Sequence, residues 1–310
     1  MRVLAVVPGP PTHGVVLHAL SVARAVGADV QHDLTTPGAS YDVVHVPFTD
    51  SLFGADIGAA AAAFEAWAAG VGVPLVVTLH DVPGADADPA REARRRAGYA
   101  RVTAAADAVV VCSAHEADRL DPRPVVVPLP VEPLAAPGPP PVWAGRSTLG
   151  VLGFVYPGKG HDGVLDAAAG TGAAVVALGG PSPGHTDLVV RLRAQAERLG
   201  VELLVTGTLS EPDLHAAARA VTVPVAAYTT AGASASLATW AAAGRRPVTT
   251  PGPYATELAA RDPDALLLSE DLHGGVANAL ADPSSTWADA ATAGPDVTKA
   301  HLAVYRSVLR

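Results

Sequence analysis

The stretch LGVLGFVYPGKGHDGVLDAAAG, residues 149 to 170, decides the fold of this chain. It opens with an apolar run, Leu149 to Val155, that has the length and composition of a buried strand. A glycine-rich turn follows, and an alanine-rich helical pattern comes directly after the turn. A strand, a turn and a helix in this order are the repeating unit of an α/β domain with a parallel sheet.

The same alternation continues after this stretch and is also found before it. Short β-branched runs lie between amphipathic segments such as Asp187 to Leu199. Their continuous apolar character is typical of strands that helices cover on both faces. The expected strands, besides Leu149 to Val155, are Arg2 to Val7, Val30 to Leu34, Asp42 to Val46, Leu75 to Leu79, Ala108 to Cys112, Pro124 to Val127, Ala174 to Leu178, Glu202 to Thr206, Thr222 to Ala226, Pro247 to Thr249 and Ala265 to Leu268.

A proline-rich run, VEPLAAPGPPPVWAG at residues 131 to 145, separates the two halves and predicts a semi-rigid connector. The chain has 310 residues, and at roughly 150 residues per domain this length fits two domains. We expect an N-terminal α/β domain over residues 1–135 and a second one over 146–295. The amphipathic helix expected at 296–310 has apolar positions that need a partner, and we expect it to cross back to the first domain.

Composition excludes several classes of function. The net charge is −9 and the sequence pI is near 5.6, which argues against binding to nucleic acid. Cys112 is the single cysteine, so we expect neither a disulfide framework nor a cysteine-based zinc site. A single cysteine also fits a reducing compartment, and we expect a cytoplasmic location. The segment Met1 to Pro8 is read as a first strand and not as a signal peptide, and we expect no integral membrane span.

The glycine turn contains the clearest candidate site. Helix N-terminal amides and the charge of Lys159, which precedes Gly160, suit the oxygens of a diphosphate. The chain has only two lysines, Lys159 and Lys299, which suggests a specific need at 159, although an ordinary surface lysine is the simpler alternative. A second anion cradle is expected at Ser234-Ala235-Ser236, where a plain serine N-cap is the alternative.

The first half places polar residues where its expected strands end. In a doubly wound sheet, ligands bind beyond the carboxyl ends of the strands. His80 is a candidate catalytic residue together with Lys159 of the second half, and a structural histidine is the alternative for His80. A metal site is not expected, because the histidines lack close spacing and acidic companions. The other candidates are the loop Pro8 to Gly14, His45, and the acceptor-binding residues His13, His18, Asp50 and Asp81.

Two further features are interpreted as non-catalytic. The basic run REARRRAGYAR, residues 91 to 101, could face an anionic acceptor or a membrane surface, but a solvated helix face is the interpretation that we favour. A hydrolase is not expected, because the chain lacks a G-x-S-x-G motif and Cys112 ends an apolar strand.

The order of the motifs resembles glycosyltransferase family 4 over nearly the whole chain. This resemblance implies the GT-B fold, in which two Rossmann-like domains face a cleft. It also implies retaining transfer from a nucleotide sugar, with no required metal and no cofactor. The stretches that carry it are YDVVHVPFTD (41–50), VVTLHD (76–81), VVVCSAHEADRL (109–120), VVVPLP (125–130), GFVYPGKGHDGVLDA (153–167), VTGTLSEPDL (205–214) and AAAGRRPV (241–248).

The resemblance assigns roles to single residues. Lys159 matches the lysine that contacts the donor diphosphate, His80 the histidine near the transferred sugar, and Gly14 the N-terminal loop glycine. Residues 206–209, with Gly207, Thr208 and Leu209, match backbone that holds the base, and Glu257 matches an acid after the last cradle.

Three positions depart from the family pattern. Phe154 stands where an arginine is usual, and Ala231 and Thr239 replace a pair of glutamates. The first glutamate recognises sugar hydroxyls, and the second contacts ribose, a role that is left to Thr239 or to another residue.

The sequence therefore predicts a retaining hexosyltransferase that acts on a carbohydrate or glycoconjugate. Mannose from GDP-mannose is favoured because of the likeness to actinobacterial-type mannosyl- and glucosyltransferases, and UDP-glucose is the alternative donor. A non-catalytic nucleotide- or glycan-binding relative and a sugar-nucleotide epimerase are the functions that compete with this prediction. The sequence does not predict an oligomeric state.

Overall fold

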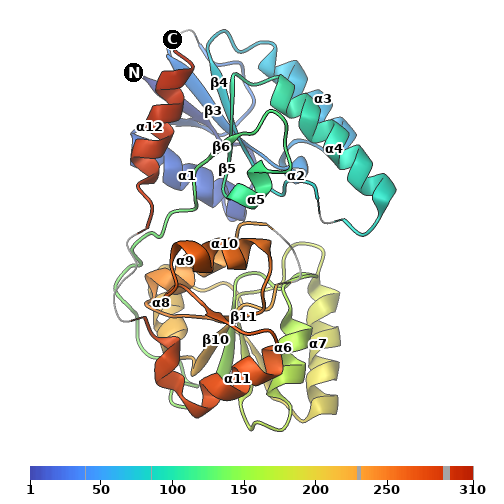
Figure 1. The fold of residues 1–310 in the computed structure, drawn as a ribbon, viewed down its shortest axis with the longest axis vertical. Coiled ribbons are helices and arrows are strands. Elements are labelled where there is room, and N and C mark those ends of the chain that lie inside the picture. The colour runs from blue at the N-terminus through green and yellow to red at the C-terminus, as the bar shows by residue number, and fades with distance from the viewer. Residues whose placement is uncertain (39, 85, 229–231, 289–293, 310) are drawn as a thin grey trace. The chain divides into compact units, whose positions relative to one another are not determined.

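The computed structural model describes residues 1–38, 40–84, 86–228, 232–288 and 294–309. The chain divides into two compact units. The first unit contains Met1–Pro130 and Pro295–Arg310, and the second contains Val131–Gly294. Each unit is a parallel sheet covered by helices (Figure 1).

The first unit is built on a six-stranded sheet with the order β2-β1-β3-β4-β5-β6. Every described pairing between these strands is parallel. Its central strands are buried along their whole length, as their near-continuous valine content predicts. The strands are β1 (Val3–Val6), β2 (Asp29–Gln31), β3 (Val43–Phe48), β4 (Leu75–Leu79), β5 (Ala108–Val111) and β6 (Val125–Val126).

Helices cover both faces of this sheet. Phe64 and Tyr99, from α3 and α4, pack on one face, and Val16 and Val304, from α1 and α12, pack on the other (Figure 1). The C-terminal helix therefore returns to the first unit. The helices are α1 (Gly14–Val26), α2 (Asp50–Phe53), α3 (Ile57–Ala68), α4 (Pro89–Ala104), α5 (Ala114–Ala117) and α12 (Val297–Ser307).

The second unit repeats the plan with the strand order β12-β11-β10-β7-β8-β9. Its described pairings are also parallel. The strands are β7 (Thr148–Leu152), β8 (Ala174–Leu178), β9 (Leu203–Val205), β10 (Val223–Val225), β11 (Val248–Thr249) and β12 (Leu267–Leu268).

The helices of the second unit also form two layers. Those that carry Leu165, Leu192 and Val276 pack on one face of the sheet, and those that carry Ala217 and Trp240 pack on the other. The helices are α6 (His161–Ala168), α7 (Thr186–Leu199), α8 (Glu211–Ala220), α9 (Ala235–Ala242), α10 (Pro253–Arg261) and α11 (Leu272–Ala281), followed by the 3-10 turn η1 (Pro283–Thr286).

Each of the strand segments expected from the sequence overlaps a strand, so the α/β class with two doubly wound sheets is confirmed. We expected the proline-rich run at residues 131–145 to connect the two units, but the structure places it within the second unit. The Glu211 carboxylate accepts from the N–H of Ala135, and Trp143 is buried in the core beside α8. Apolar burial and hydrogen bonds to α8 thus hold this run against one unit.

Candidate functional site

The glycine turn of the second unit joins β7 to α6, as the sequence predicts. Gly153, Gly158 and Gly160 adopt φ values of 108°, 92° and 83°, which residues other than glycine rarely adopt. A Cβ at position 160 would overlap the carbonyl oxygen of Ala227. The turn therefore needs glycine at 160 both for its backbone conformation and for space.

Lys159 is buried in this turn with its charge held by neutral groups. Its side chain has only 4% of its surface exposed. The ammonium donates to Ser236 Oγ at 2.8 Å and to the Tyr228 hydroxyl at 3.5 Å, and it lies 4.5 Å from the centre of the Tyr228 ring. In the described part of the chain, these contacts include no carboxylate. A buried ammonium without a counter-charge is costly, and an anion at this place would balance it.

Helix α9 brings the expected serine cradle to the same lysine. Ser236, in its first turn, binds Lys159, and Ser234 is the N-cap residue with no side-chain capping bond. The first amides of a helix are available to an anion when no side chain caps them. The Thr239 hydroxyl already donates to the carbonyl of Ala235 at 3.0 Å, and Ala231 lies outside the described residues.

His161 is a feature that the sequence analysis quoted but did not select. It is the first residue of α6 and is 2% exposed, and neither ring nitrogen has a hydrogen-bond partner among the described residues. Burial lowers its pKa to about 4, and the charge of Lys159 adds to this effect while Asp162 opposes it. A neutral imidazole therefore lies beside the buried ammonium. Its position after a Lys-Gly pair at a helix start was the available signal.

The expected base-binding segment follows β9 and is also built on glycine. The Thr206 hydroxyl accepts from the N–H of Gly179 at 3.0 Å and donates to the carbonyl of Gly207 at 2.9 Å. Thr208 is exposed, and Leu209 packs partly into the core. This geometry leaves an exposed backbone turn that a planar base can approach.

Two other positions of the second unit are placed by the structure. Phe154, which replaces the usual arginine, is 37% exposed and brings no charge to the turn. Glu257 lies half-buried in α10.

In the first unit, the loop after β1 leads into α1 through His13. The Nδ1 atom of His13 accepts from the N–H of Val15 at 3.2 Å, so the ring caps the helix. A Cβ on Gly14 would meet no atom within 4 Å. The contact that the structure shows for His13 is therefore a helix cap, which the sequence analysis did not predict, and the expected acceptor-binding role of His13 stays a prediction.

His18 and His80 come together at the carboxyl end of the first sheet. Their ring centres are 5.2 Å apart in an edge-to-face arrangement. His18 Nδ1 and His80 Nε2 are buried and have no hydrogen-bond partner in the part of the chain that the structure describes. Burial lowers the pKa of His18 to about 3 and that of His80 to about 4, with smaller contributions from neighbouring histidines. Both rings are therefore neutral near pH 7.

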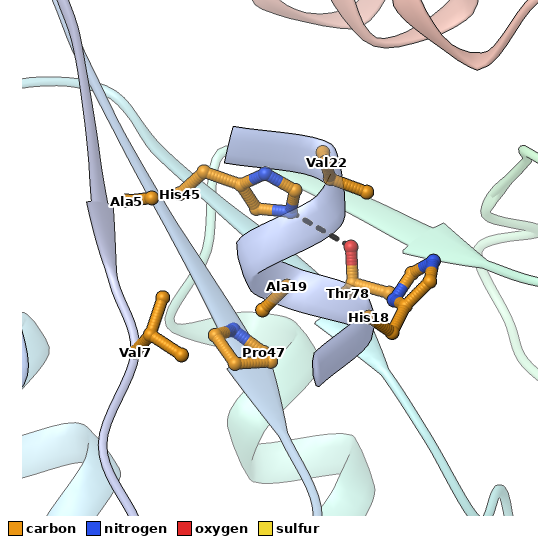
Figure 2. Close-up of a pocket in the computed structure, with 8 residues that line it drawn as sticks. All are labelled: Ala5, Val7, His18, Ala19, Val22, His45, Pro47 and Thr78. Atoms are coloured by element: carbon orange, nitrogen blue, oxygen red, sulfur yellow. Dashed lines mark hydrogen bonds between the residues drawn. The ribbon is translucent and has the colours of Figure 1, made fainter. Parts of the chain in front are cut away.

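His45 has a structural role, which corrects its place among the candidate functional histidines. Its ring bonds Thr78 Oγ1 at 2.7 Å (Figure 2). It also bonds the Tyr305 hydroxyl at 2.8 Å, so it ties α12 to β3 and β4. His18 lines the adjoining cavity, which measures about 10 Å³. This volume is close to that of a single water position, and a sugar cannot enter it.

Asp50 and Asp81 both form polar contacts with neighbouring side chains. The Thr49 hydroxyl donates to Asp81 Oδ2 at 2.8 Å. Arg95 donates to the Asp81 carbonyl at 2.7 Å and lies 3.5 Å from Asp50 Oδ2. Asp81 has a φ of 54°, an uncommon value for a residue other than glycine, and Arg95 helps to hold it there. Arg95 was hidden in the basic run, where nothing distinguished it from its neighbours.

The other arginines of that run support the interpretation as a solvated face. Arg91, Arg96 and Arg101 form ion pairs with Asp86, Glu92 and Glu65, respectively. None of the helices in the described ranges has both the length and the apolar character needed to cross a bilayer.

Residues 1–134 match the family model described as a glycosyl transferase 4-like domain. No curated protein sequence matches the chain.

Solved structures are similar over the whole chain. The Anabaena protein Alr3699/HepE, in complex with UDP-glucose, gives a TM-score of 0.71 at 16% identity, with 100% of this chain and 95% of that chain covered. A sucrose-phosphate synthase from Thermosynechococcus elongatus gives 0.68 at 12% identity, covering 100% and 96%. A glycosyltransferase from Rickettsia africae gives 0.69 at 11% identity, covering 100% and 98%. The two parallel six-stranded sheets and these matches show the GT-B fold.

Proposed function

We propose that this protein is a retaining glycosyltransferase that takes a hexose from a nucleoside diphosphate sugar. The buried Lys159 ammonium carries this proposal, because its described partners are all neutral. A donor diphosphate would supply the missing negative charge. The match of residues 1–134 to a glycosyl transferase 4-like domain supports the same class of reaction.

Stabilisation of the leaving nucleoside diphosphate is the main catalytic effect that we assign. Negative charge grows on the diphosphate as the bond to the sugar breaks. Lys159, Ser234, Ser236 and the first amides of α9 would oppose that charge, and the bond between Lys159 and Ser236 supports this assignment. The acceptor hydroxyl would attack from the face that the diphosphate leaves, with retention of configuration. The lysine supplies the positive charge, so we propose a reaction that requires no metal and no cofactor.

The first unit would bind the acceptor and the transferred sugar. We assign His80 to the sugar and His13, His18, Asp50 and Asp81 to the acceptor region. His80 is neutral near pH 7, so it would act as a hydrogen-bond partner and not as a cation. The carbonyl of His80 accepts from the Tyr99 hydroxyl at 2.6 Å, which helps to hold this segment in place.

Mannose from GDP-mannose is the donor that we propose first, and UDP-glucose is the alternative. The exposed turn at Gly207 and Thr208 offers backbone groups to either base. The structure of HepE holds UDP-glucose, which makes that donor a required arm of the test.

A thermal-shift panel with GDP, UDP, ADP, GDP-mannose, UDP-glucose and UDP-N-acetylglucosamine tests this proposal. A ligand at about 100 times its Kd stabilises a protein by roughly 2.7 kcal/mol, which raises Tm by several degrees. We expect a rise for the nucleotides of one base and a smaller rise in Lys159→Ala. No rise with any nucleotide would contradict the proposal.

A non-catalytic nucleotide-binding relative is the second candidate, and two observations favour it. Phe154 brings no charge to the diphosphate turn, and the Thr239 hydroxyl already bonds within its own helix. Donor turnover with a carbohydrate acceptor would exclude this candidate. Isomerisation of the donor without an acceptor would instead indicate a sugar-nucleotide epimerase.

A further inference from the structure

Three potential metal ligands meet at the carboxyl end of the first sheet. His18 projects from α1, His80 follows β4, and Cys112 follows β5. One ligand atom from each lies within 4.8 Å of the other two. The two strands are neighbours in the sheet, and α1 packs against its face. The fold therefore assembles a group that the sequence hides, because its members are more than thirty residues apart.

The polar atoms of this group are unusually lacking in partners. His18 Nδ1 and His80 Nε2 are buried, and within the described ranges of the chain they accept or donate no hydrogen bond. Cys112 is 2% exposed and is the single cysteine of the chain. An unpaired buried polar group costs about 1–3 kcal/mol. Two such nitrogens in a group that also contains a thiol are an independent indication of a ligand-binding site.

We propose that His18, His80 and Cys112 bind Zn²⁺ or another metal ion that prefers nitrogen and sulfur ligands. Two imidazoles and one thiolate supply three positions of a tetrahedral site, and water can take the fourth. Zn–N and Zn–S bonds of about 2.0–2.3 Å place ligand atoms roughly 3.3–3.8 Å apart. The observed ligand atoms lie within 4.8 Å of one another, and binding would bring them to these shorter separations.

The protonation states of the two histidines and of the thiol determine how a metal ion would bind here. Burial keeps both histidines neutral near pH 7, so their nitrogens can bind a metal without losing a proton. Burial raises the pKa of the Cys112 thiol, with the charge of Glu116 adding to the effect. Its proton must leave to solvent when the Zn–S bond forms, so affinity rises by about tenfold per pH unit. The other ionisable neighbours are His13 beside His80, and His45 and His301 beside His18.

Binding of Zn²⁺ would also take His80 away from the sugar. The site would then inhibit the transferase, and this consequence alone rests on the proposed function. A direct binding measurement therefore tests the site even if the transferase proposal fails.

A Co²⁺ titration of the reduced, untagged protein provides that measurement. We expect one equivalent to bind with visible bands typical of tetrahedral cobalt and with a near-ultraviolet sulfur-to-cobalt band. Cys112→Ser should lose the sulfur band, and His18→Gln and His80→Gln should each weaken Co²⁺ binding by at least about tenfold. His273→Ala, at an exposed histidine of the second unit, is the matched control and should bind as the wild type does. Zn²⁺ should displace the cobalt.

A wild-type experiment covers the case in which a variant fails to fold. Cys112 reacts with a thiol reagent only when the core opens, and bound Zn²⁺ should slow this reaction by at least about tenfold. The absence of a sulfur-to-cobalt band together with unchanged thiol labelling would overturn the proposal. A sulfur band that both histidine variants retain at wild-type affinity would overturn the assigned ligands.

Discussion

The two units have the same sheet architecture but differ in the charge of the polar groups that they bury. Three imidazoles with lowered pKa values, His18, His45 and His80, lie wholly or partly buried in the first unit, whereas the second unit buries the ammonium of Lys159 beside the neutral imidazole of His161. A histidine escapes the cost of burial by giving up its proton near pH 6.5, whereas a lysine would have to give it up against a pKa near 10.4. Near pH 7 the buried rings of the first unit are therefore uncharged, whereas an anion would balance the buried ammonium of the second.

The largest expected effect is a difference in acid stability between the units. The histidines have folded-state pKa values below the ordinary value of 6.5, so their contribution to stability is present above pH 6.5 and is lost as the pH falls toward the folded-state values. Between pH 6.5 and 5, His18 and His80, with folded-state pKa values of about 3 and 4, each cost about 2 kcal/mol. The first unit thus loses about 4 kcal/mol from these two histidines and a further amount from His45, whereas His161 costs the second unit about 2 kcal/mol.

Hydrogen exchange followed by mass spectrometry, peptide by peptide, separates the two units. We expect the first sheet to lose protection at a higher pH than the second. Loss of protection from hydrogen exchange at the same pH in both units would contradict the expected difference in acid stability. His45→Asn should reduce the pH dependence of the first unit alone.

The next effect concerns the turn that holds the lysine. Gly160→Ala combines left-handed strain of about 1–2 kcal/mol with an overlap on the Ala227 carbonyl of about 1–3 kcal/mol. Gly172→Ala is the matched control, because its φ of 75° is close to the 83° of Gly160 and a Cβ there would meet open space. Urea unfolding should show a loss of about 2–5 kcal/mol for position 160 and about 1–2 for position 172. Equal losses would mean that close packing at Gly160 is unimportant.

Removal of the lysine charge should separate folding from binding. Lys159→Met keeps the length of the side chain and eliminates a buried charge without a carboxylate partner, so the free energy of unfolding should not fall. Loss of a charge-assisted bond of about 1.5–3 kcal/mol should weaken nucleotide binding roughly 10- to 100-fold. Calorimetric titration with the nucleotide found in the thermal-shift panel measures this change. Lys299→Met, at an exposed lysine, should leave affinity unchanged, and a Lys159→Met protein with wild-type affinity would contradict the diphosphate role.

The smallest effect is expected at the hydroxyl that orients this ammonium. Ser236→Ala removes a neutral partner 2.8 Å from Lys159 Nζ, a bond worth about 0.5–1.5 kcal/mol. Nucleotide affinity should fall roughly 2- to 10-fold in the same titration. Ser285→Ala removes a similar hydroxyl bond, to the Asp282 carbonyl, far along the chain from the turn. A loss of equal size in that control would show that the effect is not specific to the cradle.

The elements of both sheets could be predicted because their signals are local. Valine runs such as those at β4 and β8 are continuous in the chain and are typical of buried strands. The Lys159 turn could be predicted for the same reason, since its glycines and its lysine are neighbours in sequence. The proline-rich run was harder, because its composition predicts an extended backbone and says nothing of the surface on which it packs.

The functional contrast between individual histidines could not be predicted from sequence. His45, His80 and His18 each lie on or beside an apolar element, and nothing near them in the chain distinguishes a structural tie from an unpartnered ring. The distinction depends on Tyr305, which is 260 residues from His45, and on Cys112, which comes from the neighbouring strand.

The sequence by itself determined the α/β class, the two sheets and the lysine-bearing glycine turn, since hydrophobic period and backbone permissiveness act over a few residues. Tertiary structure alone decided that Lys159 is buried among neutral oxygens, that Asp50 and Asp81 are held by Arg95 and Thr49, and that His18, His80 and Cys112 meet. The physical reason is that burial, charge balance and metal-ligand geometry depend on distances between segments that only the folded chain brings together.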